Sequence, residues 1–336
     1  MRRATGDADD NPHLAPARVR AALRALDVRP SREMGQNFLV DAAALAAIVA
    51  AGAPDHDETI VEVGPGLGVL TWELLRRSRQ VIAVELDRRL AGWLRQAFVG
   101  APLTVIEADV LRLTPAAMLA AARLEATQAY RVIANLPYAI TSPVLRHFLE
   151  AAHPPQSLSV LVQREVAERI IAAPGDLSVL AHAIQIHAAP RLAAIIPREA
   201  FVPVPAVESA VLVLQRRATP LVPAADQARV LRVIKAGFLH ARKQLGNSLP
   251  AGLTALGLPL ARPALLAVLE AAQVDAMRRA ETLTIAEWRR IADALAPLTP
   301  GAARRSADEP HDDGPGLDGA APAGDAADSG APAGRR

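Results

Sequence analysis

Four short runs of β-branched residues, separated by stretches with helical spacing of apolar positions, dominate the first half of the chain. The runs TIVEV, VIAVEL, LTVIEA and YRVIAN begin at residues 59, 81, 103 and 130. Strands that alternate with helices form right-handed βαβ units and a parallel sheet, so we expect an α/β fold. Helices are expected near 69–78, 87–97, 115–123, 143–151, 163–172 and 177–187, with further strands at SLSVLV, 191–196 and 209–215.

Helical patterns flank this region on both sides. Residues 14–26 have apolar groups at helical spacing, and Asp41 is placed to cap an Ala-rich helix that ends at Ala51. After Arg217 the strand pattern stops, and LPAGLTALGLP and similar segments are expected to be turns between helices. These later helices are expected at 225–240, 263–272 and 284–296. The predicted organisation is an N-terminal arm with a helix (1–30), a Rossmann-like domain (31–217), a small all-helical domain (218–300) and a Gly-, Ala-, Pro- and Asp-rich disordered tail (301–336).

Composition excludes several classes of protein. The 336 residues include no cysteine, which excludes a disulfide scaffold, a Cys-ligated zinc site, an iron–sulfur cluster and a Cys nucleophile. The eight histidines form no pattern with metal-ligand spacing, so we predict no metal. No run of about 18 apolar residues and no signal-peptide pattern occurs, so we predict no membrane association and a cytoplasmic location.

The formal net charge of +2 hides an uneven distribution. Residues 216–300 carry 12 basic and six acidic side chains, net +6, whereas residues 11–215 carry 19 of each. A basic region beside a neutral one suggests a polyanionic partner. A solvated helical surface explains the same charges equally well, so charge alone leaves both interpretations open.

A glycine-rich turn follows the first strand of the α/β region, in the segment TIVEVGPGLGVLT. Glycines such as Gly64 let the backbone approach a ligand closely, and the following helix supplies free N–H groups. Glu85 ends the second strand, where a carboxylate can accept hydrogen bonds from ribose hydroxyls. Asp109 ends the third, within reach of an adenine edge. Together they indicate a nucleoside cofactor, either NAD or S-adenosylmethionine.

The segment Asn135-Leu136-Pro137-Tyr138 ends the fourth strand and favours methyl transfer. An exocyclic adenine amine is a poor nucleophile because its lone pair is conjugated with the ring. The Asn135 side-chain oxygen and a backbone carbonyl, expected to be that of Leu136, can accept its hydrogen bonds. Pro137 stiffens the turn, and Tyr138 can stack on the base. The alternative is a Pro-containing turn with a buried tyrosine.

At this point the chain resembles the KsgA/RsmA family of 16S rRNA adenine dimethyltransferases, over about residues 35–295. The resemblance implies a Rossmann-like S-adenosylmethionine-dependent methyltransferase domain, with a seven-stranded, mostly parallel sheet, and a helical C-terminal domain. It departs near 174–177, where relatives commonly have a longer loop. The matching motifs are GQNFLVD, VEVGPGLGVLT, VIAVELD, EAD, ANLPY, QREVAERI, REAFVPVPAVESAV, RKQLGNSL and RRAETLT.

The resemblance also implies a set of site residues. Those that would bind S-adenosylmethionine are Asn37, Leu39, Gly64, Glu85, Asp109 and Asn135. Those that would serve catalysis are Asn135, Leu136, Pro137 and Tyr138, with Phe201 facing the target base; a core position remains the alternative for Phe201. Arg242 and Lys243, and less specifically Arg232 and Lys235, would contact rRNA phosphates.

The implied reaction dimethylates two adjacent adenosines, 1518 and 1519, near the 3′ end of 16S rRNA. The partner would be 16S rRNA within the 30S subunit or its precursor, and the enzyme would act as a monomer. Two other functions stay open. One is the related large-subunit methyltransferase, whose members usually read NIPY in place of NLPY. The other is a non-catalytic assembly factor, against which the intact NLPY segment argues.

Overall fold

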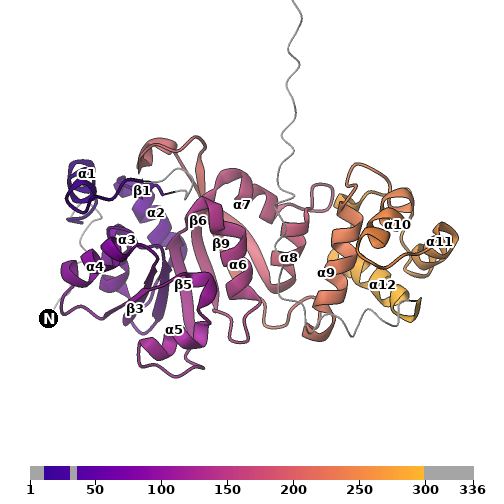
Figure 1. Cartoon of the computed structure of the whole chain (residues 1–336), viewed down its shortest axis with the longest axis horizontal. Coiled ribbons are helices and arrows are strands. Elements are labelled where there is room, and N and C mark those ends of the chain that lie inside the picture. Colours follow the sequence, from indigo (N-terminus) through magenta and orange to yellow (C-terminus); the bar gives the residue numbers. More distant parts are fainter. Residues whose placement is uncertain (1–10, 31–35, 299–336) are drawn as a thin grey trace, which may run out of the picture. The chain divides into compact units, whose positions relative to one another are not determined.

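The computed structural model describes residues 11–30 and 36–298 (Figure 1). Its main sheet contains β2 (Thr59–Val63), β3 (Gln80–Glu85), β4 (Leu103–Glu107), β5 (Tyr130–Asn135), β6 (Ser157–Gln163), β7 (Ala188–Ile196) and β9 (Ser209–Arg216). The strand order is β4-β3-β2-β5-β6-β9-β7. Pairs from β4 to β6 are parallel, whereas β9 runs antiparallel to β6 and β7. The predicted seven-stranded, mostly parallel sheet is confirmed.

Most helices alternate with these strands, as predicted, and α1 precedes them. Asp41 caps α2 as expected, since its side chain accepts a hydrogen bond of 2.7 Å from the Ala44 N–H. A two-residue strand, β1 (Phe38–Leu39), pairs with β8 (Phe201–Val202) in a small second sheet. The helices before the C-terminal region are α1 (Pro16–Ala25), α2 (Ala42–Gly52), α3 (Val69–Arg77), α4 (Arg88–Ala97), α5 (Pro115–Ala121), α6 (Thr141–Leu149), α7 (Arg164–Ile171) and α8 (Val179–His187).

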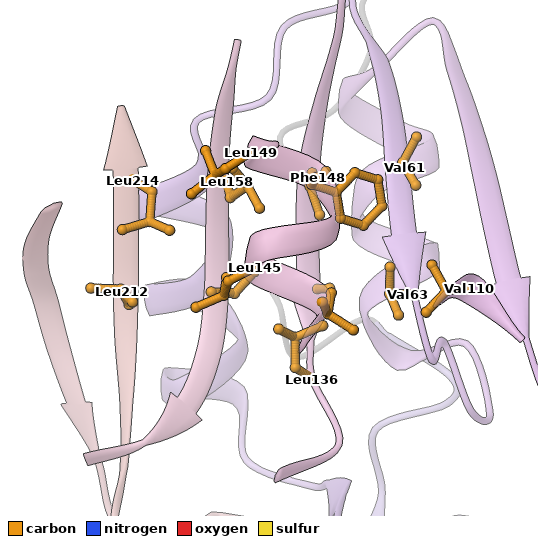
Figure 2. Close-up of a cluster of buried hydrophobic side chains, with 14 of the residues drawn as sticks. Val61, Val63, Val110, Leu136, Leu145, Phe148, Leu149, Leu158, Leu212 and Leu214 are labelled. Carbon is orange, nitrogen blue, oxygen red and sulfur yellow. The ribbon is translucent and has the colours of Figure 1, made fainter. Parts of the chain in front are cut away.

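Helices cover both faces of the sheet, and this explains the unbroken apolar runs of its central strands. Figure 2 shows Leu145 and Phe148 of α6 packed over one face, where Val61 of β2 belongs to the same buried cluster. Ile60, the residue before Val61, belongs instead to the cluster with Leu45 of α2 on the other face. Successive strand residues point to opposite faces, so a strand covered on both sides must be apolar throughout.

The carboxyl ends of the parallel strands meet at one edge of the sheet. Glu85 at the end of β3 lies beside Glu107 of β4, and Asn135 at the end of β5 lies beside Leu161 of β6. After β2, the chain builds β3 and β4 on one side and then returns to place β5 on the other. A crevice forms where the direction reverses, and ligands of open α/β sheets bind there.

The C-terminal region contains α9 (Ala224–Phe238), α10 (Leu245–Ala255), α11 (Arg262–Ala271) and α12 (Ile285–Leu295) around its own buried cluster, which includes Trp288. The turn predicted at LPAGLTALGLP is wrong for its first part, because α10 continues through Pro250. The division into domains at residues 30, 217 and 300 stays a prediction, and the tail predicted for 301–336 lies outside the described residues.

The loop near 174–177 contacts the C-terminal region. The Gly175 and Leu177 N–H groups both donate to the carbonyl of Glu281, over 2.9 and 3.2 Å. This loop thus connects the start of α8 to the segment before α12. Within residues 11–30 and 36–298, none of the helices has the length and apolar character needed to cross a bilayer.

Candidate active site

A cleft opens at the reversal point between β2 and β5. Its walls come from the carboxyl ends of β2, β3 and β5 and from the segment around β1, which are far apart in sequence. The structure therefore brings together the predicted residues Asn37, Leu39, Gly64, Glu85 and the whole segment from Asn135 to Tyr138. The lining residues are Gln36, Asn37, Phe38, Leu39, Glu62, Gly64, Pro65, Gly66, Leu67, Val69, Leu70, Glu85, Leu90, Asn135, Leu136, Pro137 and Tyr138.

The glycine-rich turn forms the floor of this cleft between β2 and α3. Gly64 and Gly66 have φ values of +64° and +60°, which side chains with a Cβ rarely adopt. A Cβ on Gly66 would also lie 3.2 Å from Cε1 of Phe38. The turn needs glycine for its conformation and for the close approach of the β1 segment.

Glu85 connects the glycine-rich turn to the end of β3. Its Oε2 accepts a hydrogen bond of 3.1 Å from the Gly66 N–H, and its Oε1 accepts one of 2.9 Å from the Asp87 N–H. Burial raises the pKa of Glu85 above its ordinary value, and these two backbone donors offset only part of that rise. The two oxygens keep further lone pairs, which can accept hydrogen bonds from the hydroxyls of a ribose.

Glu62 is a second carboxyl group in the same wall, and it is 1% exposed. The Thr71 hydroxyl donates a hydrogen bond of 2.6 Å to its Oε2. Burial, together with the nearby Glu85, raises the pKa of Glu62 to about 8 despite the hydrogen bond from Thr71. Glu62 is therefore mainly protonated at neutral pH in this structure, beside a more exposed Glu85.

The segment after β5 presents polar atoms to the cleft. The Asn135 side-chain N–H donates to the Asn37 carbonyl over 3.2 Å, which fixes the amide orientation. None of the described residues donates to its side-chain oxygen, which stays available to a ligand. The Leu136 N–H donates to the Leu161 carbonyl over 3.1 Å, and the Leu136 side chain is buried in the core (Figure 2). The backbone and the side chain of Leu136 thus anchor this turn to the sheet and to the core.

Tyr138 is fixed at the far end of this segment. Its hydroxyl lies 2.6 Å from the Ser209 hydroxyl on β9, and burial raises the pKa of Tyr138. The ring remains partly exposed in the cleft wall, so one part is anchored and another is open to a ligand. An anchored, partly exposed aromatic ring is suited to stacking on a base.

Phe201 takes the core position that the sequence left open as an alternative. It pairs with Leu39 between β8 and β1, but its side chain is 1% exposed and lies in the apolar cluster on the α2 side of the sheet. It does not line the cleft. Its ring fills the core beside the short β1–β8 sheet, and a role opposite a target base stays a prediction.

Asp109 also lies outside the cleft wall. Its Oδ1 accepts a hydrogen bond of 3.0 Å from the Leu111 N–H and caps the short helix that follows β4. Its role as an adenine ligand stays a prediction. Leu67, Leu90 and Gln36 line the cleft without having been predicted. Leu67 lies within the motif VEVGPGLGVLT and Gln36 within GQNFLVD, so the sequence could have indicated both. Leu90 lies in none of the matching motifs.

The four predicted RNA contacts lie on α9 and just after it. Lys235, Arg242 and Lys243 are exposed, and Arg232 is partly exposed. None of the four forms an ion pair with another described residue. Their side chains are free to meet an external anion, and their role stays a prediction. The same described part of the chain contains no cluster of His, Asp and Glu side chains that could hold a metal ion.

Comparisons with known proteins agree on one family. A family model described as "Ribosomal RNA adenine dimethylase" matches residues 29–291. A "Ribosomal RNA small subunit methyltransferase A" of Dehalococcoides mccartyi is 38% identical over 276 residues, covering 82% of this chain and 91% of the relative. One from Desulfitobacterium hafniense is 40% identical over 266 residues, covering 79% and 91%.

Two solved structures share the architecture. A dimethyladenosine transferase from Plasmodium falciparum has a TM-score of 0.64 and 20% identity, over 77% of this chain and 98% of that one. A 23S rRNA methyltransferase, ErmE, has a TM-score of 0.58 and 28% identity, over 77% and 99%. The first likeness supports the methyltransferase fold.

Proposed function

The chain belongs to the ribosomal RNA adenine dimethylase family, and on that basis we propose that it transfers methyl groups from S-adenosylmethionine to 16S rRNA. The proposed acceptors are the exocyclic amines of two adjacent adenosines in the 3′-terminal hairpin loop, dimethylated during 30S subunit biogenesis. The observation that carries the proposal is that the segment from Asn135 to Tyr138 lines the same cleft as Gly64 and Glu85.

The residues of the cleft fit S-adenosylmethionine. The glycine-rich turn leaves room where a Cβ would intrude, and the Glu85 carboxylate is held by two backbone donors with lone pairs to spare. Leu67 and Leu90 give the cleft an apolar surface that can accommodate a nucleoside. When bound, S-adenosylmethionine supplies a methyl group on a sulfonium, already activated for attack by a nucleophile.

The protein's contribution to the chemistry is positioning. The Asn135 amide is oriented by Asn37, so that its side-chain oxygen can accept a hydrogen bond from the target amine. The turn at Pro137 directs the Leu136 carbonyl towards the same amine. Hydrogen bonds from the amine to these two acceptors draw its hydrogens out of the plane of the base. The amine nitrogen then becomes pyramidal, and its lone pair is available to attack the methyl group. No strong base is needed, since the amine becomes acidic only as it is methylated.

The target adenine must leave its stack to reach this cleft, and an rRNA hairpin loop makes that easier than a duplex does. Tyr138, anchored through Ser209, would replace one stacking partner. Arg232, Lys235, Arg242 and Lys243 would hold the rRNA phosphates. Assembly of 30S subunits would place the enzyme in the cytoplasm, where we propose that it acts as a monomer.

Methyl transfer to purified 30S subunits that lack the two dimethyladenosines tests this function. We expect dimethyladenosine in the 3′-terminal hairpin, detected by mass spectrometry of the 16S rRNA. Asn135→Ala should lower kcat at least 100-fold, because it removes an acceptor that acts in the transition state. Binding to 30S subunits should stay within about twofold, since Asn135 is not a phosphate contact. Unchanged methylation by Asn135→Ala would contradict the mechanism.

A parallel reaction with protein-free 23S rRNA distinguishes the second candidate. The 28% identity to the 23S rRNA methyltransferase ErmE makes it a specific alternative. The small-subunit relatives are more similar, at 38% and 40% identity, and they favour 16S rRNA. Methylation of 23S rRNA with none of 30S subunits would overturn the proposed substrate while leaving the reaction class intact.

A further inference from the structure

The N-terminal helix α1 packs directly behind the wall of the cleft. Val19 and Leu23 on its inner face belong to a buried cluster with Phe38, Leu67 and Leu90. These last three residues line the cleft. Figure 1 shows α1 beside β1. The outer face of α1 is therefore about one helix diameter, ~10–12 Å, from the cleft wall.

Specific contacts hold this segment in place on both sides of the helix. Before α1, the Asn11 side-chain N–H donates 2.8 Å to the Val69 carbonyl in the first turn of α3, and Asn11 is buried. After α1, an Arg89 N–H donates 2.5 Å to the Asp27 carbonyl. The His13 ring packs against Phe98, with 5.1 Å between centroids. The position of α1 relative to the glycine-rich turn is thus fixed.

The outer face of α1 carries positive charge without compensation. Arg20 and Arg24 are exposed, lie four residues apart on one helix face, and form no ion pair with a described residue. Like charges at this spacing destabilise a helix slightly. Residues 11–30 contain four arginines and a single acid, Asp27. Some other arginines of the described residues do pair with carboxylates, as Arg131 does with Glu58 at 3.0 Å.

We propose that the outer face of α1, through Arg20 and Arg24, binds the phosphate backbone of the rRNA strand that delivers the target adenosine. This inference rests on the proposed function and names a contact surface beyond the basic C-terminal region. All of α1 precedes residues 29–291, which the family model matches, so the match itself assigns it nothing. The guanidinium groups suit phosphate recognition, and the fixed contacts of α1 hold this helix against the wall of the cleft.

The double variant R20Q/R24Q tests the surface. Glutamine keeps the helix propensity and removes both charges. We expect the affinity for 30S subunits to fall roughly tenfold, and the slope of log K against log salt to become shallower by about 1.4–1.8, the value for two phosphate contacts. The KM for S-adenosylmethionine should stay within twofold. R20K/R24K, which keeps the charge, should retain most of the affinity.

The matched control is R79Q/R123Q, which removes two exposed charges before β3 and β5, at the opposite edge of the sheet from the cleft. If the control weakens binding as much as R20Q/R24Q, the effect is one of net charge and the inference is wrong. Unchanged affinity and salt slope in R20Q/R24Q also overturn it. If the wild-type protein neither binds nor methylates rRNA, the proposed function is wrong as well. If the wild-type protein methylates rRNA and R20Q/R24Q binds as tightly as wild type, only the inference is wrong.

Discussion

Two carboxyl groups share the cleft wall, and burial affects them differently. Glu85 has two backbone N–H donors that stabilise its charge, whereas Glu62 has only the Thr71 hydroxyl. Burial therefore raises the pKa of Glu62 to about 8. Because Glu62 stays protonated at neutral pH, the negative charge of this wall lies on Glu85, at the end of β3.

The pH dependence of stability should reveal the proton on Glu62. Its pKa is about 8 in the folded protein and near 4.5 ordinarily, so the folded state binds more protons between these values. The stability due to this proton is fully present below pH 4.5 and lost as pH rises to 8. The loss is at most ~1.4 kcal/mol per pH unit. We expect Glu62→Gln to remove it.

Urea unfolding of both proteins at pH 5, 6, 7 and 8 provides the measurement. The free energy of unfolding of Glu62→Gln relative to wild type should increase steadily with pH. Partly buried His13 and buried His182 and His187, whose pKa values are lowered by desolvation, contribute equally to both proteins and cancel in the difference. The control is Glu107→Gln, at an exposed strand end, for which no such increase with pH is expected. If the difference in the free energy of unfolding between Glu62→Gln and wild type stays constant with pH, Glu62 is charged and the prediction is wrong.

At the scale of elements, α10 shows why a helix can escape a sequence pattern. Its segment contains Pro250 and Gly252, which normally interrupt helices. Here the backbones of α9 and α10 approach so closely that a Cβ on Gly252 would lie 1.9 Å from the Ala236 carbonyl oxygen. The glycine thus serves packing between helices, and no local pattern carries that information.

Gly252→Ala should therefore destabilise the C-terminal region, although alanine favours helices more than glycine does. The clash is with backbone, which cannot rotate away, so we expect a loss of roughly 2–4 kcal/mol in the free energy of unfolding. Thermal and urea unfolding measure it. Gly92→Ala in α4 is the matched control, because Gly92 is also helical and nothing lies within 4 Å of its Cβ position. A stabilised Gly252→Ala protein would refute the close contact.

The candidate site shows the same division between what local sequence predicts and what it does not. Strand ends were predictable, because runs of β-branched residues mark buried strands and the polar residue that follows each one lies at the shared edge. Gly64, Glu85 and Asn135 come together for this reason. Phe201 and Leu90 depend on how separate elements pack. The pairing of β8 with β1 directs Phe201 into the core, which the motif AFVPVP does not reveal.

At the scale of the whole molecule, positive charge is concentrated in two places, α1 and the region after residue 216. The net charge of residues 11–215 is zero, but this total combines a basic segment, α1 and its flanks, with an acidic remainder. If both surfaces bind the same rRNA, each contributes separately to affinity, because they lie on different elements with separate buried clusters.

Combining R20Q/R24Q with R242Q/K243Q tests whether both surfaces act on one ligand. Arg242 and Lys243 are exposed after α9 and unpaired among the described residues. Changes at separate sites add in free energy, so the fold-losses in 30S affinity should multiply, from roughly tenfold for each pair to about a hundredfold for all four. The salt slope should become shallower by about 3. A quadruple variant no weaker than either double variant would mean that the two surfaces do not bind the same rRNA at the same time, because a second loss can only appear if both contacts exist in one complex.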